Sequence, residues 1–187
     1  MSQAGSIFQI NVSNGGVPKL PIEEGQVVFR GLTRDRQGDL RHHGSLEQAL
    51  CLYSIERLAA LAAEGHHVSP GATGENLTLI DVDWDLVVPG RRLRLGDDVV
   101  IEVTDYASPC SKNARWFKSG DFSRIDQELH PGFSRVYARV LIEGVIRTGD
   151  TVTFPDAENA ADRLERLQPH TYRWPRDFAS AGRSRES

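Results

Sequence analysis

The segment VVIEVTDYASPC, Val99 to Cys110, determines how the rest of the chain is interpreted. Polar and apolar side chains alternate along Val100–Asp105, and a period of two is typical of a strand with one buried face. Pro109 ends this strand, because proline has no backbone N–H to donate to a neighbouring strand. The thiol of Cys110 therefore follows at a rigid strand end.

Cys110 has two interpretations from the sequence. Free cysteine is among the most often buried residue types, so it could be a small core residue. Alternatively, Lys112 and Arg115 follow closely and favour the thiolate, which is both the nucleophile and the metal ligand. The other cysteine, Cys51, lies in the apolar run Ala49–Tyr53, and we expect it in the core.

Length and composition limit the class of protein. A chain of 187 residues with 39% hydrophobic and 26% charged residues suits one globular domain with a sizeable core. The formal net charge of -4 argues against general nucleic-acid binding, which needs a positive surface. The two cysteines form no CxxC pair, and no segment has the composition of a signal peptide or a membrane span. We therefore expect a cytoplasmic protein that binds neither nucleic acid nor membranes.

Outward from Val99, the chain consists of short strand-like runs separated by turns. Pro89 and Gly90 mark one reversal, and Gly96 and Asp97 mark the next. The other predicted strands are Ser6–Val12, Gln26–Phe29, Leu77–Ile80, Leu86–Val88, Arg91–Leu95, Arg135–Ile142 and Thr151–Phe154. Many short strands with frequent glycine are typical of a closed or nearly closed β domain. We predict a mainly β fold with a few short helices.

The segment Ser45–Gly65 can be divided in two ways. As one helix it would begin at Ser45, with Gln48 completing a capping box. As two elements it would be a buried strand, Ala49–Tyr53, followed by a helix that Ser54 caps and Gly65 ends. We favour the second division.

The segment Gly31–Gly44 is rich in cationic side chains and poor in apolar ones. Its cationic residues are Arg34, Arg36, Arg41, His42 and His43. Such a run is often a solvated surface, but guanidinium groups match phosphate oxygens, and histidine adds donors whose charge changes near neutral pH. A zinc pair at His42 and His43 is disfavoured, since adjacent side chains diverge and no spaced ligands complete a tetrahedral set. Lys19, flanked by two prolines, is either a surface lysine or a further cation held towards such a site.

Asn76, in the compact segment Gly74–Ile80, also has two interpretations. It could form a turn, or its amide could pair with the edge of a heterocycle. The sequence does not separate the two roles.

The chain changes character after Phe154. We predict one domain over residues 1–154 and a C-terminal extension over residues 155–187, in which a short helix at Ala160–Leu167 precedes a mobile tail.

Seven stretches together carry a resemblance to a known family. They are NVSNGGVPKLP (11–21), LTRDRQGDLRHHG (32–44), ALCLYSIERLAAL (49–61), GATGENLTL (71–79), RRLRLGD (91–97), the strand into SPC (108–110), and YARVLIEGVIRTGD (137–150). Their order and spacing resemble the MOSC family, named for the C-terminal domain of molybdenum cofactor sulfurase, and especially its small stand-alone bacterial members. The chain departs from the family pattern at Ser45 and Leu46, where a further glycine and often a proline are expected.

The resemblance implies a compact MOSC β-barrel that binds the molybdenum cofactor, with Cys110 as the molybdenum ligand. A soft thiolate suits a metal that is already bound by dithiolene sulfurs. The cations expected to hold the pterin phosphate are Lys19, Arg34, Arg36, His42 and His43. Asn76 is the candidate for the pterin ring, and Ser111 and Lys112 are further cofactor contacts beside the thiol.

Two functions follow from the resemblance. The first is the reduction of small N-hydroxylated compounds, such as hydroxylaminopurines, to amines, with protons from His42 or His43. The chain has no flavin, haem or iron–sulfur motif, so a separate redox protein would deliver the electrons. The second is a carrier of persulfide sulfur or of the cofactor, without redox turnover. Pyridoxal phosphate, which the sulfurases hold in another domain, is not expected.

Overall fold

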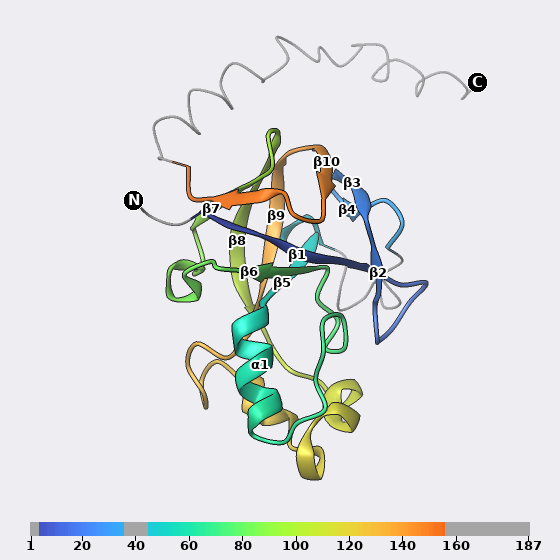
Figure 1. Ribbon diagram of the computed structural model, residues 1–187, viewed down its shortest axis with the longest axis vertical. Coiled ribbons are helices and arrows are strands. Elements are labelled where there is room, and N and C mark those ends of the chain that lie inside the picture. The colour runs from blue at the N-terminus through green and yellow to red at the C-terminus, as the bar shows by residue number, and fades with distance from the viewer. Residues whose placement is uncertain (1–3, 36–44, 156–187) are drawn as a thin grey trace, which may run out of the picture.

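A computed structural model of the protein describes residues 4–35 and 45–155. Seven strands form a closed barrel in this part of the chain, because the last strand pairs with the first (Figure 1). Around the ring they are β1 (Gly5–Val12), β11 (Thr151–Thr153), β7 (Arg92–Leu95), β8 (Val99–Ala107), β9 (Arg135–Ile142), β5 (Leu50–Ser54) and β6 (Leu77–Ile80). The predicted mainly β barrel is confirmed.

Four short strands extend or flank the barrel. β2 (Leu20–Ile22) pairs with the second half of β1, and β10 (Gly144–Arg147), β3 (Glu24–Val28) and β4 (Gly31–Leu32) form a separate small sheet. The predicted strand Leu86–Val88 is wrong. A short 3-10 helix, η2 (Trp84–Leu86), occupies the start of that segment, where Asp83 accepts a hydrogen bond from the backbone of Asp85.

Alternating side chains along the strands fill the interior of the barrel. On β8, Ile101 and Val103 are buried, and on β9 the alternate residues Val136, Ala138 and Val140 are buried beside them. This is the period-two pattern that the sequence predicts. The residues between them, on the other face of β9, are therefore available to line a site outside the barrel.

The segment Ser45–Gly65 divides into a strand and a helix, as predicted. All five residues of β5 are buried, and α1 (Ile55–Ala63) follows directly. The Ser54 hydroxyl caps α1 by accepting a hydrogen bond from the Arg57 backbone at 3.1 Å. A short 3-10 helix, η1 (Leu46–Gln48), precedes β5.

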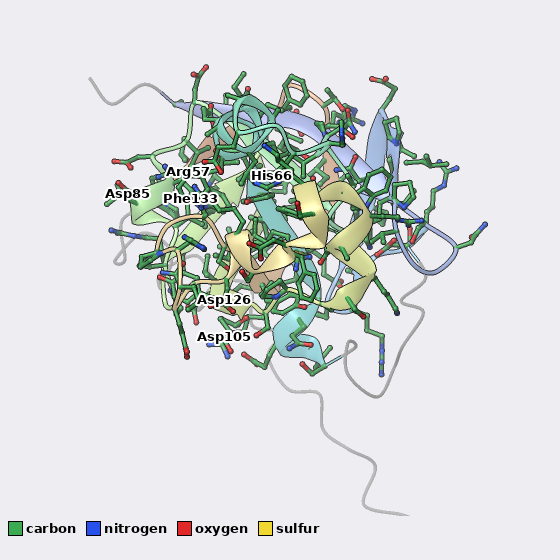
Figure 2. All side chains as sticks on the ribbon, turned by 90° about the horizontal axis from the view of Figure 1, so that it is seen from below. Arg57, His66, Asp85, Asp105, Asp126 and Phe133 are labelled. Carbon is green, nitrogen blue, oxygen red and sulfur yellow. The ribbon has the colours of Figure 1, made fainter. Side chains whose placement is uncertain are left out.

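A small lobe of 3-10 helices lies beside α1 at one end of the barrel (Figure 1). It consists of η3 (Ser111–Trp116), η4 (Lys118–Gly120) and η5 (Phe122–Ile125). Arg124 joins this lobe to α1 through its ion pair with Glu64 at 2.7 Å, and the Arg57 guanidinium lies over the Phe133 ring (Figure 2).

The predicted division into a domain over residues 1–154 and an extension over residues 155–187 stays a prediction. Residues 156–187, which include the predicted helix at Ala160–Leu167, lie outside the described part of the chain. Within the described part, no helix is both long enough and apolar enough to cross a membrane.

Candidate active site around Cys110

The Cys110 thiol lies at the exposed end of the longest strand, β8, where the chain turns into η3. The Cys110 backbone carbonyl accepts a hydrogen bond from the Asn113 backbone N–H at 2.9 Å. The Asn113 side-chain oxygen in turn faces the Cys110 backbone N–H at 3.4 Å and its sulfur at 3.9 Å. The interpretation of Cys110 as a core residue is therefore wrong, because the thiol is exposed and its loop is held by a buried asparagine.

A row of three side chains crosses the outer face of the sheet near this thiol. Cys51 on β5 pairs in register with Tyr137 on β9, which pairs with Asp105 on β8. The register shifts between Val103 and Asp105, and such a bulge redirects side chains. Val103 therefore points into the core, whereas Asp105 shares the outer face with Tyr137.

Cys51 is buried as predicted, but its surroundings are polar on one side. Its side chain is only 6% exposed, and burial raises the pKa of its thiol to about 11. The charged groups of Arg135, Glu75 and Lys19 lie near enough to influence this pKa in opposite directions. Cys51 therefore separates the apolar interior of the barrel from the polar groups around residues 108–113, which we call the Cys110 loop.

Arg135 lies at the centre of these polar groups and is 6% exposed. Its guanidinium donates hydrogen bonds to the carbonyl oxygens of Thr73 and Ser108, the latter at 3.3 Å. The Asn113 amide donates to the same Thr73 oxygen at 3.2 Å. The Thr73 carbonyl and the Arg135 guanidinium thus join three segments: the loop Gly71–Asn76, the Cys110 loop and β9.

Glu75 is a fully buried acid in the loop Gly71–Asn76. One of its oxygens accepts a hydrogen bond from the Gly71 backbone at 2.6 Å, and the other accepts one from the Thr73 hydroxyl at 2.7 Å. Burial raises the pKa of Glu75, although these hydrogen bonds oppose the change. The acid therefore closes its own loop and does not pair directly with Arg135.

A second network contains two of the predicted cofactor contacts. Lys19 forms an ion pair with Asp35, and the same Asp35 oxygen accepts a hydrogen bond from the Asn76 amide at 2.8 Å. The Asn76 side-chain oxygen accepts from the Cys51 backbone at 3.1 Å, and its amide also reaches the Asn11 carbonyl at 3.3 Å. Both ends of the Asn76 side chain are thus engaged by protein, and its role in binding a pterin stays a prediction.

The loop Gly71–Asn76 connects this network to the Cys110 loop. The Lys19 backbone donates to the Gly71 carbonyl at 2.8 Å. On the other side, Thr73 contacts Asn113 and Arg135. Lys19 and Cys110, far apart in the sequence, therefore flank the same loop.

The structure describes some of the remaining predicted site residues and not others. Ser111 and Lys112 are exposed at the start of η3, directly after the thiol, and Arg34 is exposed beside Asp35. Arg36, His42 and His43 lie outside the described residues. Their roles as cofactor contacts and proton donors stay predictions.

A cavity of about 300 Å³ opens beside the Cys110 loop. Its lining residues are Asp105, Tyr106, Ala107, Ser108, Asp126, Gln127, Glu128 and Ser134. Figure 2 shows Asp105 and Asp126 next to each other at this end of the molecule, and both line the cavity. Ser108 lines the cavity and lies two residues before Cys110, so the cavity adjoins the chain segment that carries the thiol, although Cys110 itself is not among the lining residues.

The sequence does not identify Arg135, Tyr137 or Glu75 as site residues. Alternation along Arg135–Ile142 does place Arg135 and Tyr137 on one face of a strand, which is the one signal that could have found them. Which strand lies beside that face depends on the barrel order, and a single sequence does not reveal it.

Comparison with known proteins places these features in a family. The family model described as the MOSC domain matches residues 39–153. The uncharacterized protein YflK of Bacillus subtilis is 31% identical over 136 residues, which are 72% of this chain and 60% of YflK. A protein of Gibberella moniliformis named Reductase is 31% identical over 115 residues, which are 59% of this chain but 20% of that protein. The chain thus spans less than two thirds of either relative.

Solved structures support the same family through the fold. The crystal structure of YiiM from Geobacillus stearothermophilus superposes with a TM-score of 0.62 at 26% identity, covering 81% of this chain and 75% of YiiM. The family match covers more than half of the chain, and it includes β5 to β11 and the Cys110 loop. The chain belongs to the MOSC domain family.

Proposed function

We propose that the protein is a molybdenum-dependent reductase of small N-hydroxylated compounds, with Cys110 as the metal ligand. The observation that carries the proposal is the exposed Cys110 thiol on a loop fixed by Arg135 and Asn113, beside a cavity of about 300 Å³. Membership of the MOSC family and the relative named Reductase support an oxidoreductase.

The residues of the site fit a molybdenum cofactor by their chemistry. A thiolate is a soft ligand, and an exposed cysteine can reach a metal that arrives from solvent. The cofactor is an anion, and Arg135 is a buried cation whose Nε atom has no hydrogen-bond partner. We assign Cys110 to the metal, and the predicted cations Lys19, Arg34, Arg36, His42 and His43 to the phosphate. Ser111 and Lys112 would contact the cofactor beside the thiol, and Asn76 would support the pterin site.

When bound, the cofactor would supply the redox chemistry, because the chain itself has no flavin, haem or iron–sulfur motif. The overall reaction is R–NHOH with two protons and two electrons giving R–NH2 and water. The N–O bond breaks, the nitrogen is reduced, and the oxygen leaves as water. We assign the electrons to a separate redox protein, the protons to His42 or His43, and the reaction to the cytoplasm.

The protein's own part is to hold the substrate beside the thiol. The residues that line the cavity include three acids, Asp105, Asp126 and Glu128, and two serines, Ser108 and Ser134. Such groups suit the N–H and O–H donors of a hydroxylamine. We therefore place the N-hydroxylated substrate in this cavity, with its reacting nitrogen directed towards Cys110.

Reduction of a hydroxylaminopurine tests this function directly. Protein made in cells that synthesise the cofactor is assayed with a chemical one-electron reductant in place of the natural donor. We expect Cys110→Ala to abolish amine formation, whereas Cys51→Ala, which removes the other thiol, retains it. Full activity in folded Cys110→Ala protein would show that the assignment is wrong.

An exposed thiol also suits a second candidate, a sulfur carrier. The Cys110 thiolate would attack the outer sulfur of a donor persulfide, so that the S–S bond breaks and the donor thiolate leaves. Cys110 would then carry the persulfide. Mass spectrometry of metal-free protein separates the candidates, because the carrier predicts an adduct of about 32 Da on Cys110.

A further inference from the structure

We propose that Arg135 is a positioning residue that fixes the Cys110 loop over a buried positive charge, so that the site favours anionic groups at the sulfur. This inference deepens the proposed function and rests on it only in treating Cys110 as the reactive residue. It concerns the apoprotein, and it can be tested without cofactor or substrate.

The positioning role follows from the hydrogen bonds of the guanidinium. Arg135 holds the carbonyl of Ser108, two residues before Cys110, at 3.3 Å. It also holds the carbonyl of Thr73, which receives the Asn113 amide at 3.2 Å. Asn113 faces the Cys110 backbone and sulfur. One side chain thus restrains the Cys110 loop from both of its ends.

The charge of Arg135 is not balanced by a direct ion pair with any described residue. Each ion pair between described residues involves other cations, and Glu75 uses its oxygens for Gly71 and Thr73. The neighbouring phenols of Tyr53 and Tyr137 are neutral near pH 7, because burial raises both of their pKa values, that of Tyr137 to about 12. A buried guanidinium without a carboxylate partner is costly, so an anion bound nearby would be stabilised.

The remaining charges around the site divide it into two sides. Two acids, Asp105 and Asp126, line the cavity, and Asp105 pairs in register with Tyr137. Arg135 does not line the cavity, and its guanidinium donates a hydrogen bond to the carbonyl oxygen of the lining residue Ser108 at 3.3 Å. We infer that the sulfur end of the site attracts anions, whereas the cavity end repels them.

Two alkylating reagents of different charge test this inference. Iodoacetate is an anion and iodoacetamide is neutral, and both react with the same thiolate. The ratio of their rates at Cys110 therefore cancels the thiolate fraction and reports the local electrostatic potential. Rates are measured at low ionic strength by mass spectrometry of the Cys110 peptide, so that Cys51 does not contribute.

Three variants give the comparison. Arg135→Met removes the charge, and Arg135→Lys keeps it. Arg139→Met removes a cation from the same face of β9 that pairs instead with Glu47 and Glu102. Loss of a unit charge roughly 10 Å away should lower the rate ratio about two- to fourfold at an effective dielectric constant between those of protein and water. We expect that fall in Arg135→Met, and a wild-type ratio in Arg135→Lys and Arg139→Met.

An unchanged ratio in folded Arg135→Met protein would overturn the inference, as would an equal fall in Arg139→Met. If Arg135→Met does not fold, Arg135→Gln keeps a hydrogen-bond donor without the charge and should show the same fall. The inference and the proposed function fail separately. A wild-type ratio in Arg135→Met refutes the role of Arg135, whereas an active Cys110→Ala protein refutes the function.

Discussion

Replacement of Asn76 by alanine separates a structural role from a cofactor-binding role at this position. The Asn76 side chain is 4% exposed and makes three hydrogen bonds within the protein. Two of them join strands, through the Cys51 backbone and the Asn11 carbonyl, and the third reaches the carboxylate of Asp35. We expect Asn76→Ala to destabilise the apoprotein, whatever its effect on cofactor binding.

The size of the effect follows from the groups left without a partner. An unsatisfied buried N–H at Cys51 costs about 1–3 kcal/mol, and a lost hydrogen bond to a charged group costs about 1.5–3 kcal/mol. Asp35 keeps its ion pair with Lys19 and its hydrogen bond from the Ser13 backbone at 2.8 Å, so the second cost is reduced. We expect a total loss of about 2–4 kcal/mol in the free energy of unfolding.

Urea unfolding of the apoprotein at pH 7 measures this loss. With a slope of about 2 kcal/mol per molar urea, the midpoint should fall by roughly 1–2 M. The exposed turn residue Asn14 provides the control, and Asn14→Ala should stay within about 0.5 kcal/mol of wild type. A loss below about 1 kcal/mol in Asn76→Ala, with an unchanged slope, would contradict the hydrogen-bond argument.

Three further predictions follow from single features of the structure. Iodoacetamide should label Cys110 readily in the folded protein but leave Cys51 unlabelled until urea unfolds the protein, because Cys51 is buried and burial raises the pKa of its thiol to about 11. Equal labelling rates of the two cysteines in the folded protein would contradict this. Because burial raises the pKa of Glu75, its carboxyl holds the proton more tightly in the folded protein than in the unfolded chain. The free energy of unfolding should therefore fall as the pH rises above about 4.5. In Glu75→Gln, the urea midpoint should depend less on pH between pH 4 and 7. Gly71→Ala should destabilise the protein by about 2 kcal/mol or more in the same assay, because Gly71 has a φ of +82° and a Cβ there would lie 2.3 Å from the Lys19 carbonyl oxygen; wild-type stability would contradict it.

The fold was largely predictable because it depends on local patterns. Alternation along Val100–Asp105 predicts β8, and a serine cap after a short apolar run predicts the boundary between β5 and α1. The predicted strand Leu86–Val88 fails because Asp83 begins a 3-10 turn at Trp84, a local hydrogen bond that overrides β propensity.

The site was predictable only in part, since it depends on contacts between distant segments. Pro109 predicts that Cys110 follows a strand end, and the structure shows the thiol exposed there, which decides between the two interpretations that the sequence left open. Arg135 and Tyr137 were missed because their surroundings depend on barrel order and on the register shift before Asp105. A sequence pattern gives the face of a strand, whereas the partner of that face requires the full topology.

Elemental analysis for molybdenum tests the central claim most directly, because it needs neither the substrate nor the electron donor. Wild-type protein and the Cys51→Ala and Cys110→Ala variants are purified from cells that synthesise the cofactor. We predict molybdenum in proportion to protein in wild type and Cys51→Ala, and its loss in folded Cys110→Ala. Equal molybdenum in all three proteins, or none in any of them, would contradict the assignment of Cys110 as the metal ligand.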